Sequence, residues 1–167
     1  MSSVFLPDIF VDTVFDMDLE DLKSKKIKAF IFDIDNTLAT YAMPVADEKT
    51  AAWVKKLKAD GFKIFIVSNN DKERVRIFSE NIDVPYFGKA LKPLGIFLRR
   101  ACKSMGVTPK ETALVGDQLF TDVWGAKRTG ISNILVKPIH PKEEIQIVLK
   151  RRLEKIVLYC YKRSLKR

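Results

Sequence analysis

The sequence predicts an α/β fold, with a three-layer, doubly wound and mainly parallel sheet that carries helices on both faces. Two observations predict this fold. Short apolar runs typical of buried strands alternate with segments in which apolar residues recur at helical spacing. Several of the apolar runs also end abruptly in polar residues, as parallel strands do where a ligand binds beyond their carboxyl ends.

The expected strands are short runs of apolar residues. The run at 85–87 is the weakest of them, because it is so brief. A helix-like segment follows most of the runs, so successive strands are expected to lie parallel. The runs are residues 27–32, 63–67, 85–87, 112–115 and 133–136.

The expected helices lie between these strands. In the first of them, Trp53, Val54 and Leu57 mark the face that points inward. Glycine readily adopts the left-handed conformation that ends many helices, and a glycine follows three of the segments, at positions 61, 106 and 130. The segments are about 47–59, 71–81, 93–105 and 120–128.

The chain is expected to form one structural domain with three parts, since 167 residues suit a single core. Residues 1–26 hold scattered apolar positions and a short helix-like piece, and are expected to be an N-terminal arm packed on the core. Residues 27–141 form the core itself. Residues 142–167 are expected to be a basic amphipathic C-terminal helix.

Composition excludes several classes of protein. Hydrophobic residues make up 47% and charged residues 31%, which is typical of a globular chain and not of a disordered one. No signal peptide and no apolar run of about 20 residues is visible, so a cytoplasmic location is expected. Two isolated cysteines cannot make a disulfide framework or a zinc site.

The densest polar cluster is Asp33-Ile34-Asp35-Asn36-Thr37, which directly follows the strand-like run at 27–32. Burying carboxylates at the end of an apolar strand is costly unless a cation or a hydrogen-bond donor compensates. Mg²⁺ takes oxygen ligands and is commonly shared with a substrate phosphate. The cluster therefore indicates a magnesium-dependent phosphoryl-transfer site, although an Asp- and Asn-rich turn would look similar.

Other strands end in the same way. Ser68 and Asn69 follow the run at 63–67, and Asp117 follows the run at 112–115, with Asp122 five residues further on. Lys92 comes shortly after the weak third strand. Because the carboxyl ends of parallel strands share one edge of the sheet, these side chains are expected to gather there.

Phosphoryl transfer needs an in-line nucleophile and a proton donor for the leaving oxygen. Asp33 is the expected nucleophile, forming an aspartyl-phosphate. Asp35 is expected to protonate the leaving oxygen and then to activate water. Thr37, Ser68 and Asn69 are short polar residues suited to the phosphate oxygens, and Lys92 supplies a positive charge to nucleophile and phosphate.

The expected Mg²⁺ ligands are Asp33, the main-chain carbonyl of Asp35, and Asp117. Asp122 is either a further ligand or a residue that supports the others. Without a cation, the mutual repulsion of these carboxylates would be prohibitive.

In this order, the clusters resemble the four motifs of the haloacid dehalogenase-like (HAD) phosphatases over about residues 27–137. The resemblance implies a HAD-like Rossmannoid fold, Mg²⁺ and an aspartyl-phosphate intermediate. Further motifs resemble the YqeG-like group of subfamily III, related to the phosphatidylglycerophosphate phosphatases of mitochondria and plastids. These are Leu6-Pro7-Asp8, Asp35-Asn36-Thr37-Leu38, Ser68-Asn69-Asn70, Lys92-Pro93-Leu94-Gly95, and the run from Gly116 to Asp122.

The spacing of the motifs leaves no room for an inserted cap domain, since 35 residues separate Asp33 from Ser68 and 24 separate Ser68 from Lys92. An open site suits a phosphate carried on a large molecule, such as a lipid, a protein or a nucleic-acid end. A partner subunit acting as a lid would remove this inference. Resemblance and the tail together favour phosphatidylglycerophosphate as the substrate.

The tail carries most of the net charge of +9, because residues 142–167 hold nine Lys or Arg and three Glu, a net of +6. Apolar residues recur at helical spacing from Ile145 beside a basic stripe. Such a helix can lie on an anionic membrane through residues 145–167, at the inner face, or pack its apolar stripe on the core, and the two are not exclusive. No motif supports nucleic-acid binding, and the oligomeric state is open.

Other readings of the site remain open in the sequence. A soluble sugar-phosphate or protein-phosphate phosphatase would use the same residues. A signalling receiver domain also carries an aspartyl-phosphate with Mg²⁺, but its acceptor lies on the third strand, whereas Asp33 follows the first strand of the predicted core. An idle anion-binding scaffold would have no need for all of these groups.

Overall fold

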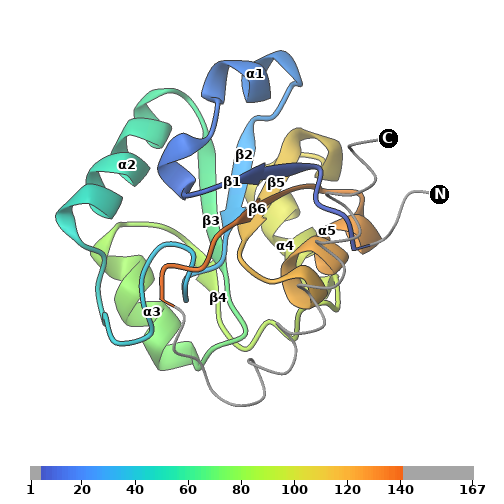
Figure 1. The fold of residues 1–167 in the computed structure, drawn as a ribbon. Helices are drawn as coiled ribbons and strands as arrows, with labels where there is room; N and C mark the ends of the chain where they lie inside the picture. Colours follow the sequence, from blue (N-terminus) through green and yellow to red (C-terminus); the bar gives the residue numbers. More distant parts are fainter. Residues whose placement is uncertain (1–4, 141–167) are drawn as a thin grey trace.

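The structure is a computed structural model that describes residues 5–140. Over this range the chain forms one parallel sheet with strand order β1-β6-β5-β2-β3-β4 (Figure 1). The α/β fold predicted from the sequence is therefore confirmed. The strands are β1 (Ile9–Val11), β2 (Ala29–Phe32), β3 (Lys63–Val67), β4 (Tyr86–Phe87), β5 (Thr112–Gly116) and β6 (Ser132–Val136).

Helices cover both faces of this sheet (Figure 1). Alternate residues of β2 point to opposite faces, so Phe30 and Phe32 enter one apolar cluster while Ala29 and Ile31 enter the other. The first cluster packs under α2 and α3 and the second under α4 and α5, which gives three layers. The helices are α1 (Leu19–Ser24), α2 (Glu48–Ala59), α3 (Lys72–Asn81), α4 (Ile96–Met105) and α5 (Trp124–Thr129), with short turns η1 (Val14–Asp16), η2 (Pro109–Glu111) and η3 (Leu119–Val123).

Local sequence explains where these helices begin and end. The carboxylate of Asp47 accepts a hydrogen bond of 2.7 Å from the main-chain nitrogen of Thr50 and so caps the start of α2. Gly106 and Gly130 follow α4 and α5 with φ of +64° and +73°. This is the left-handed conformation in which glycine meets no Cβ clash, so the helix ends predicted at these glycines are confirmed.

The N-terminal segment, expected as an arm packed on the core, contributes a strand that was not predicted. Residues 9–11 form β1, which pairs in parallel with β6 at the edge of the sheet. Asp8 holds it there, because its Oδ2 accepts hydrogen bonds from the main-chain and side-chain nitrogens of Asn133, at 3.0 and 2.7 Å. Asp8 also pairs with Lys127 of α5.

The last predicted helix also differs in detail. The main-chain oxygen of Gln118 accepts from the nitrogens of both Asp122 and Val123, at 3.0 and 3.2 Å, which makes η3 a wide π-type turn before α5. Between β2 and Lys92 the chain forms only α2, β3, α3 and β4, so the prediction that no cap domain is inserted is confirmed for this segment.

The predicted helix at 142–167, including its membrane-binding stretch 145–167, lies outside the described residues. Among residues 5–140, no helix combines the length and apolar character needed to cross a bilayer.

Candidate active site

The polar residues predicted from the strand ends meet at one edge of the sheet. β2 lies between β5 and β3, with Phe32 opposite Val115 on one side and Ile66 on the other. The ends of these strands therefore lie side by side, and Asp33 and Asp117, which follow them, are neighbours at this edge. Asp33, Ser68 and Asp117 are all buried.

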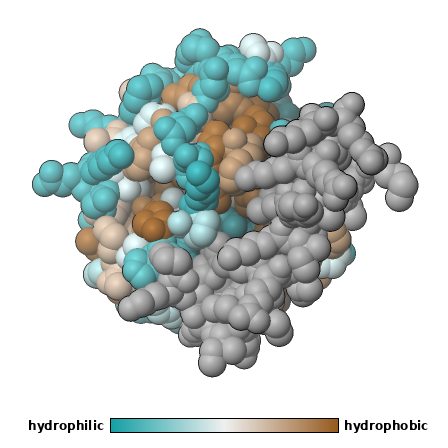
Figure 2. Space-filling view, in the orientation of Figure 1, coloured by the Kyte–Doolittle hydropathy of each residue, from teal (hydrophilic) through white to brown (hydrophobic). Residues whose placement is uncertain are grey.

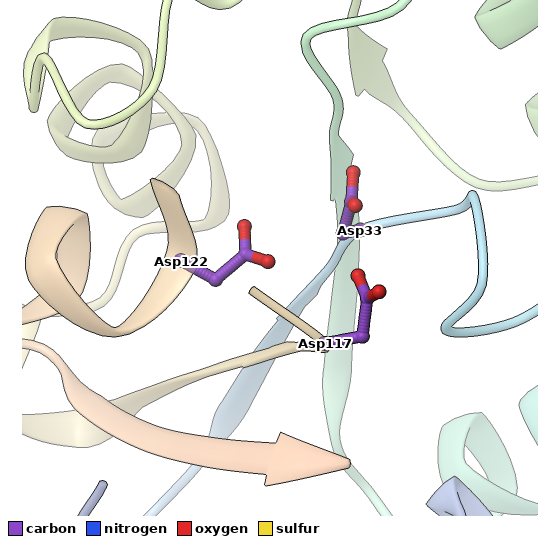
Figure 3. A group of neighbouring side chains, drawn as sticks. All are labelled: Asp33, Asp117 and Asp122. Carbon is purple, nitrogen blue, oxygen red and sulfur yellow. The ribbon is translucent and has the colours of Figure 1, made fainter. Parts of the chain in front are cut away.

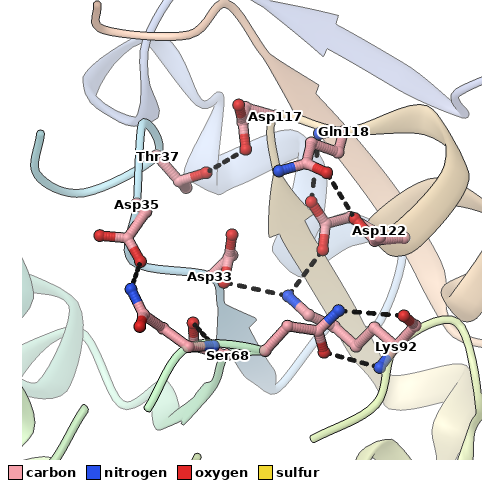
Figure 4. A network of polar contacts seen from close by, with 11 residues as sticks. Asp33, Asp35, Thr37, Ser68, Lys92, Asp117, Gln118 and Asp122 are labelled. Carbon is pink, nitrogen blue, oxygen red and sulfur yellow. Dashed lines mark hydrogen bonds and ion pairs between the residues drawn. The ribbon is translucent and has the colours of Figure 1, made fainter. Parts of the chain in front are cut away.

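A buried lysine links two of the carboxylates. The Nζ of Lys92 lies 3.0 Å from Oδ1 of Asp33 and 2.7 Å from Oδ1 of Asp122 (Figure 4). The side chains of Lys92 and Asp122 are each 2% exposed and that of Asp33 is 9% exposed. At this depth such a cation is tolerated only because both neighbours are negatively charged.

The titration of these groups reflects their burial. Burial raises the pKa of Asp33 to about 6, and the negative charges of Asp122 and Asp35 add to this rise, although the ammonium of Lys92 opposes it. Burial by itself lowers the pKa of Lys92, but the carboxylates of Asp122 and Asp33 outweigh it, so the net shift is upward. Lys92 is therefore a fixed positive charge beside Asp33.

Asp33, Asp117 and Asp122 form a group that fits a divalent cation. One carboxylate oxygen from each lies within 4.8 Å of the others, and all three residues are buried (Figure 3). An all-oxygen donor set of this kind suits Mg²⁺ better than a soft metal. Asp122 already bonds Lys92 through Oδ1 and the main-chain nitrogen of Gln118 through Oδ2, at 3.1 Å.

Gly116 makes room for this group. A Cβ added at Gly116 would lie 2.3 Å from both Cγ and Oδ2 of Asp122, far inside contact distance. Only glycine lets the end of β5 approach the Asp122 carboxylate so closely. In the sequence this glycine is visible only as part of a motif, and its steric role appears only in the structure.

Thr37 and Asp117 come together across the site. The hydroxyl of Thr37 lies 3.4 Å from Oδ1 of Asp117, and both residues are buried (Figure 4). A tight turn carries Thr37 there, in which the main-chain nitrogens of Thr37 and Leu38 both bond the oxygen of Ile34. Asn36 has φ of +60° in this turn, a conformation that Asn adopts more readily than most residues.

The segment after β3 supports Lys92. The side chain of Asn69 donates to the main-chain oxygen of Lys92 at 3.0 Å and accepts from its main-chain nitrogen at 2.7 Å. Asn69 thus holds Lys92 through both amide atoms, and its predicted contact with phosphate stays a prediction. The hydroxyl of Ser68 accepts from the main-chain nitrogen of Asn70 at 3.3 Å.

Asp35 lies on the Asp33 side of the site and is not part of the three-carboxylate group (Figure 4). Asn70 donates to its Oδ2 at 2.7 Å, and Arg74 of α3 donates to its Oδ1. Neither Arg74 nor the side chain of Asn70 was predicted to act at the site. With 30 Lys and Arg in the chain, only the three-dimensional arrangement distinguishes this arginine.

The sequence matches one protein family and several known proteins. The family described as mitochondrial PGP phosphatase matches residues 1–140. "Probable phosphatase YqeG" of Bacillus subtilis (strain 168) is 37% identical over 164 residues, which cover 98% of this chain and 95% of that protein. "Phosphatidylglycerophosphate phosphatase 1, chloroplastic/mitochondrial" of Arabidopsis thaliana is 28% identical over 97% of this chain, which spans 49% of the plant protein.

Two further similarities are more distant. "Glyceraldehyde 3-phosphate phosphatase" of Pyrococcus furiosus is 28% identical over 72% of this chain and 53% of its own length. The crystal structure of a HAD phosphatase from Thermococcus onnurineus superposes with a TM-score of 0.57 at 16% identity, covering 71% of this chain and 90% of that one. At this identity the superposition supports the fold alone.

Proposed function

The chain belongs to the mitochondrial PGP phosphatase family and is a phosphatase of the HAD type, and from this premise we propose that it hydrolyses phosphomonoesters through a phosphoryl group carried on Asp33. The observation that carries the proposal is the burial of Asp33 against Lys92, within reach of Asp117 and Asp122. A buried carboxylate at the end of a central strand, held by one fixed cation, suits a nucleophile.

The residues divide the reaction between them. An oxygen of Asp33 attacks phosphorus while Asp35 gives a proton to the leaving oxygen, and water then attacks the phosphorus of the aspartyl-phosphate while Asp35 takes a proton back. Lys92 balances charge on Asp33 and on the phosphoryl oxygens. Thr37 and Ser68 supply hydroxyl groups for those oxygens.

The carboxylates of the site would also hold a magnesium ion. Asp33, Asp117 and the main-chain oxygen of Asp35 would bind it, with Asp122 supporting the site through Lys92. When bound, Mg²⁺ neutralises the phosphate oxygens and lessens the repulsion between nucleophile and substrate.

We propose phosphatidylglycerophosphate, or another large phosphorylated molecule, as the substrate. Five large apolar side chains on loops or a helix start at the carboxyl edge of the sheet are 45–67% exposed, on the same edge as the candidate site. An acyl-chain substrate would cover them. They are Tyr41, Leu91, Leu94, Ile96 and Ile139.

A cavity of about 460 Å³ beside Thr37 adds to this support. It lies between α2, η1 and the end of β6, and its walls include Phe15, Leu38 and Met43. Figure 2 shows apolar side chains among hydrophilic ones on this face of the molecule. A lipid phosphate bound near Thr37 would find apolar surface next to its phosphate.

The test is release of inorganic phosphate from phosphatidylglycerophosphate in mixed micelles with Mg²⁺, with Asp33→Asn as the comparison. We expect turnover by the wild type and a loss of at least about a thousandfold in the variant, because a covalent route needs the nucleophile. Activity of Asp33→Asn equal to that of the wild type refutes the assignment of Asp33 as the nucleophile. Turnover of soluble esters without turnover of the lipid refutes the substrate.

The archaeal relative favours a second candidate, a phosphatase of a small sugar phosphate such as glyceraldehyde 3-phosphate. The chemistry would be unchanged, and only the groups around the leaving oxygen would differ. Adding glyceraldehyde 3-phosphate to the same assay separates the two candidates, because the lipid proposal predicts the higher kcat/KM for the micellar substrate.

A further inference from the structure

Arg74 reaches from α3 to Asp35 with an unusually complete set of contacts. Its Nε and Nη2 donate to Oδ1 of Asp35 at 3.1 and 2.8 Å. The two side chains are 14% and 19% exposed, so solvent screens this pair far less than it screens a surface ion pair.

Arg74 also fixes the loop that follows Asp35. Its Nη1 donates to the main-chain oxygen of Met43 at 2.6 Å, and its Nη2 donates to that of Thr40 at 3.1 Å. The guanidinium carbon lies 5.5 Å from the centre of the Tyr41 ring. One planar side chain therefore ties α3, the loop at 40–43 and the Asp35 carboxylate together, which lysine cannot do with a single ammonium.

The other oxygen of Asp35 is held as well. Asn70 donates to Oδ2 at 2.7 Å, so three donors act on this carboxylate. A carboxylate offers about four lone-pair positions, which leaves one for a proton or for the substrate. The orientation of Asp35 is thus set before any substrate arrives.

We propose that Arg74 is a positioning residue for proton transfer by Asp35, and that Asn70 assists it. This inference rests on the function proposed above. Asp35 lies outside the group of Asp33, Asp117 and Asp122, so neither the carboxylate group nor Lys92 holds it in place. Arg74 and Asn70 do so instead.

Arg74 acts in both halves of the reaction through Asp35. A bond forms between an Asp33 oxygen and phosphorus, the bond from phosphorus to the leaving oxygen breaks, and the proton of Asp35 passes to that oxygen to give an alcohol. In the second half a water oxygen bonds to phosphorus, the bond to Asp33 breaks, and the water proton returns to Asp35. Arg74 gains and loses no proton.

This role predicts a dependence on the leaving group. An alkoxide is a poor leaving group and needs the proton from a correctly placed acid, whereas 4-nitrophenolate leaves without one. Loss of Arg74 is therefore expected to slow hydrolysis of an alkyl phosphate much more than hydrolysis of 4-nitrophenyl phosphate. A purely structural role for Arg74 would slow both alike.

The experiment compares kcat/KM for glycerol 3-phosphate and 4-nitrophenyl phosphate in Arg74→Met, Arg74→Lys and Arg76→Met. Arg76 is a matched control on the same helix, since it pairs with Glu73 and Glu80 at the surface. We expect Arg74→Met to lose about a hundredfold on the alkyl ester and less than about tenfold on the aryl ester. Arg74→Lys should show the same selectivity with a smaller loss, and Arg76→Met should match the wild type on both esters.

Equal losses on the two esters, or no loss, overturn the inference. If Arg74→Met does not fold, the ratio of the two losses in Arg74→Lys decides the question by the same criterion. A wild type that hydrolyses neither ester nor the micellar lipid in the presence of Mg²⁺ overturns the proposed function, and the inference with it. An active wild type with an unselective Arg74 variant overturns the inference alone.

Discussion

Replacing Lys92 by methionine should destabilise the protein through the charges that it leaves behind. Methionine has a similar unbranched length, so the substitution removes the ammonium and keeps most of the packing. Asp33 and Asp122, which lie 3.0 and 2.7 Å from Nζ, then lose their shared cation while both stay buried. The change therefore isolates the electrostatic role of Lys92.

The expected magnitude follows from this geometry. Removing one partner of a buried ion pair costs about 3–5 kcal/mol, because the remaining charge stays out of water. Lys92 is 2% exposed and serves two carboxylates, so the free energy of unfolding without metal should fall by at least about 3 kcal/mol at pH near 7.5. Lys103→Met is the control, since Lys103 lies exposed on α4 and its loss should change stability by about 0.5 kcal/mol or less.

The penalty should also depend on pH. Burial raises the pKa of Asp33 to about 6 even with Lys92 opposing it, so loss of Lys92 raises it further. A carboxyl with a raised pKa binds its proton more tightly in the folded state, so its protonation restores stability as pH falls. The difference in the free energy of unfolding between wild type and Lys92→Met should therefore become smaller as pH is lowered from about 7.5 to about 5.5.

Urea unfolding in EDTA at several pH values measures this difference directly. With Mg²⁺ the difference should shrink, because the ion supplies positive charge to the same carboxylates. A difference in unfolding free energy below about 1 kcal/mol at pH near 7.5 is what a surface salt bridge contributes, and it would refute the account of Lys92 as a buried counter-charge. A difference of constant size across the pH range would refute it equally.

Three further predictions concern the same group of side chains. Burial raises the pKa of Asp33 from 3.8 to about 6, so the free energy of unfolding of the metal-free wild type should fall, relative to that of Asp33→Asn, as pH rises through this window. Parallel pH profiles of the two proteins in urea unfolding would contradict this. Gly116→Ala should displace the Asp122 carboxylate from Lys92, lower the free energy of unfolding by about 1–3 kcal/mol and reduce phosphate release at least tenfold. Gly125→Ala is the control and should not reduce phosphate release, because its added Cβ meets nothing nearer than 3.4 Å. Mg²⁺ at about a hundred times its dissociation constant should stabilise the wild type by about 2.7 kcal/mol in thermal melts. Asp117→Asn should lose most of that stabilisation at the same Mg²⁺ concentration, and full stabilisation of the variant would place the ion elsewhere.

The central strands and the residues after them were predictable because their signals are local. The run at 63–67 reads as a buried strand, and the polar residues from Ser68 onward mark its end. Parallel pairing then brings such ends to one edge, so the meeting of Asp33 with Asp117 required no further information.

Other parts depend on contacts between distant residues. β1 has only three residues, partly exposed, and it is set by the bonding of Asp8 to Asn133, 125 positions along the chain. The pairing of Arg74 with Asp35 likewise requires α3 to lie beside the loop at 40–43. Neither leaves a pattern in the local sequence.

The claim that a buried Asp33 accepts the phosphoryl group is tested most directly by acid quenching during turnover, reduction of any aspartyl-phosphate with borohydride, and peptide mass spectrometry. The account predicts homoserine at position 33 only in samples that received substrate and Mg²⁺, and none at position 35. Modification of a different residue, or turnover with no modified residue at all, would contradict it.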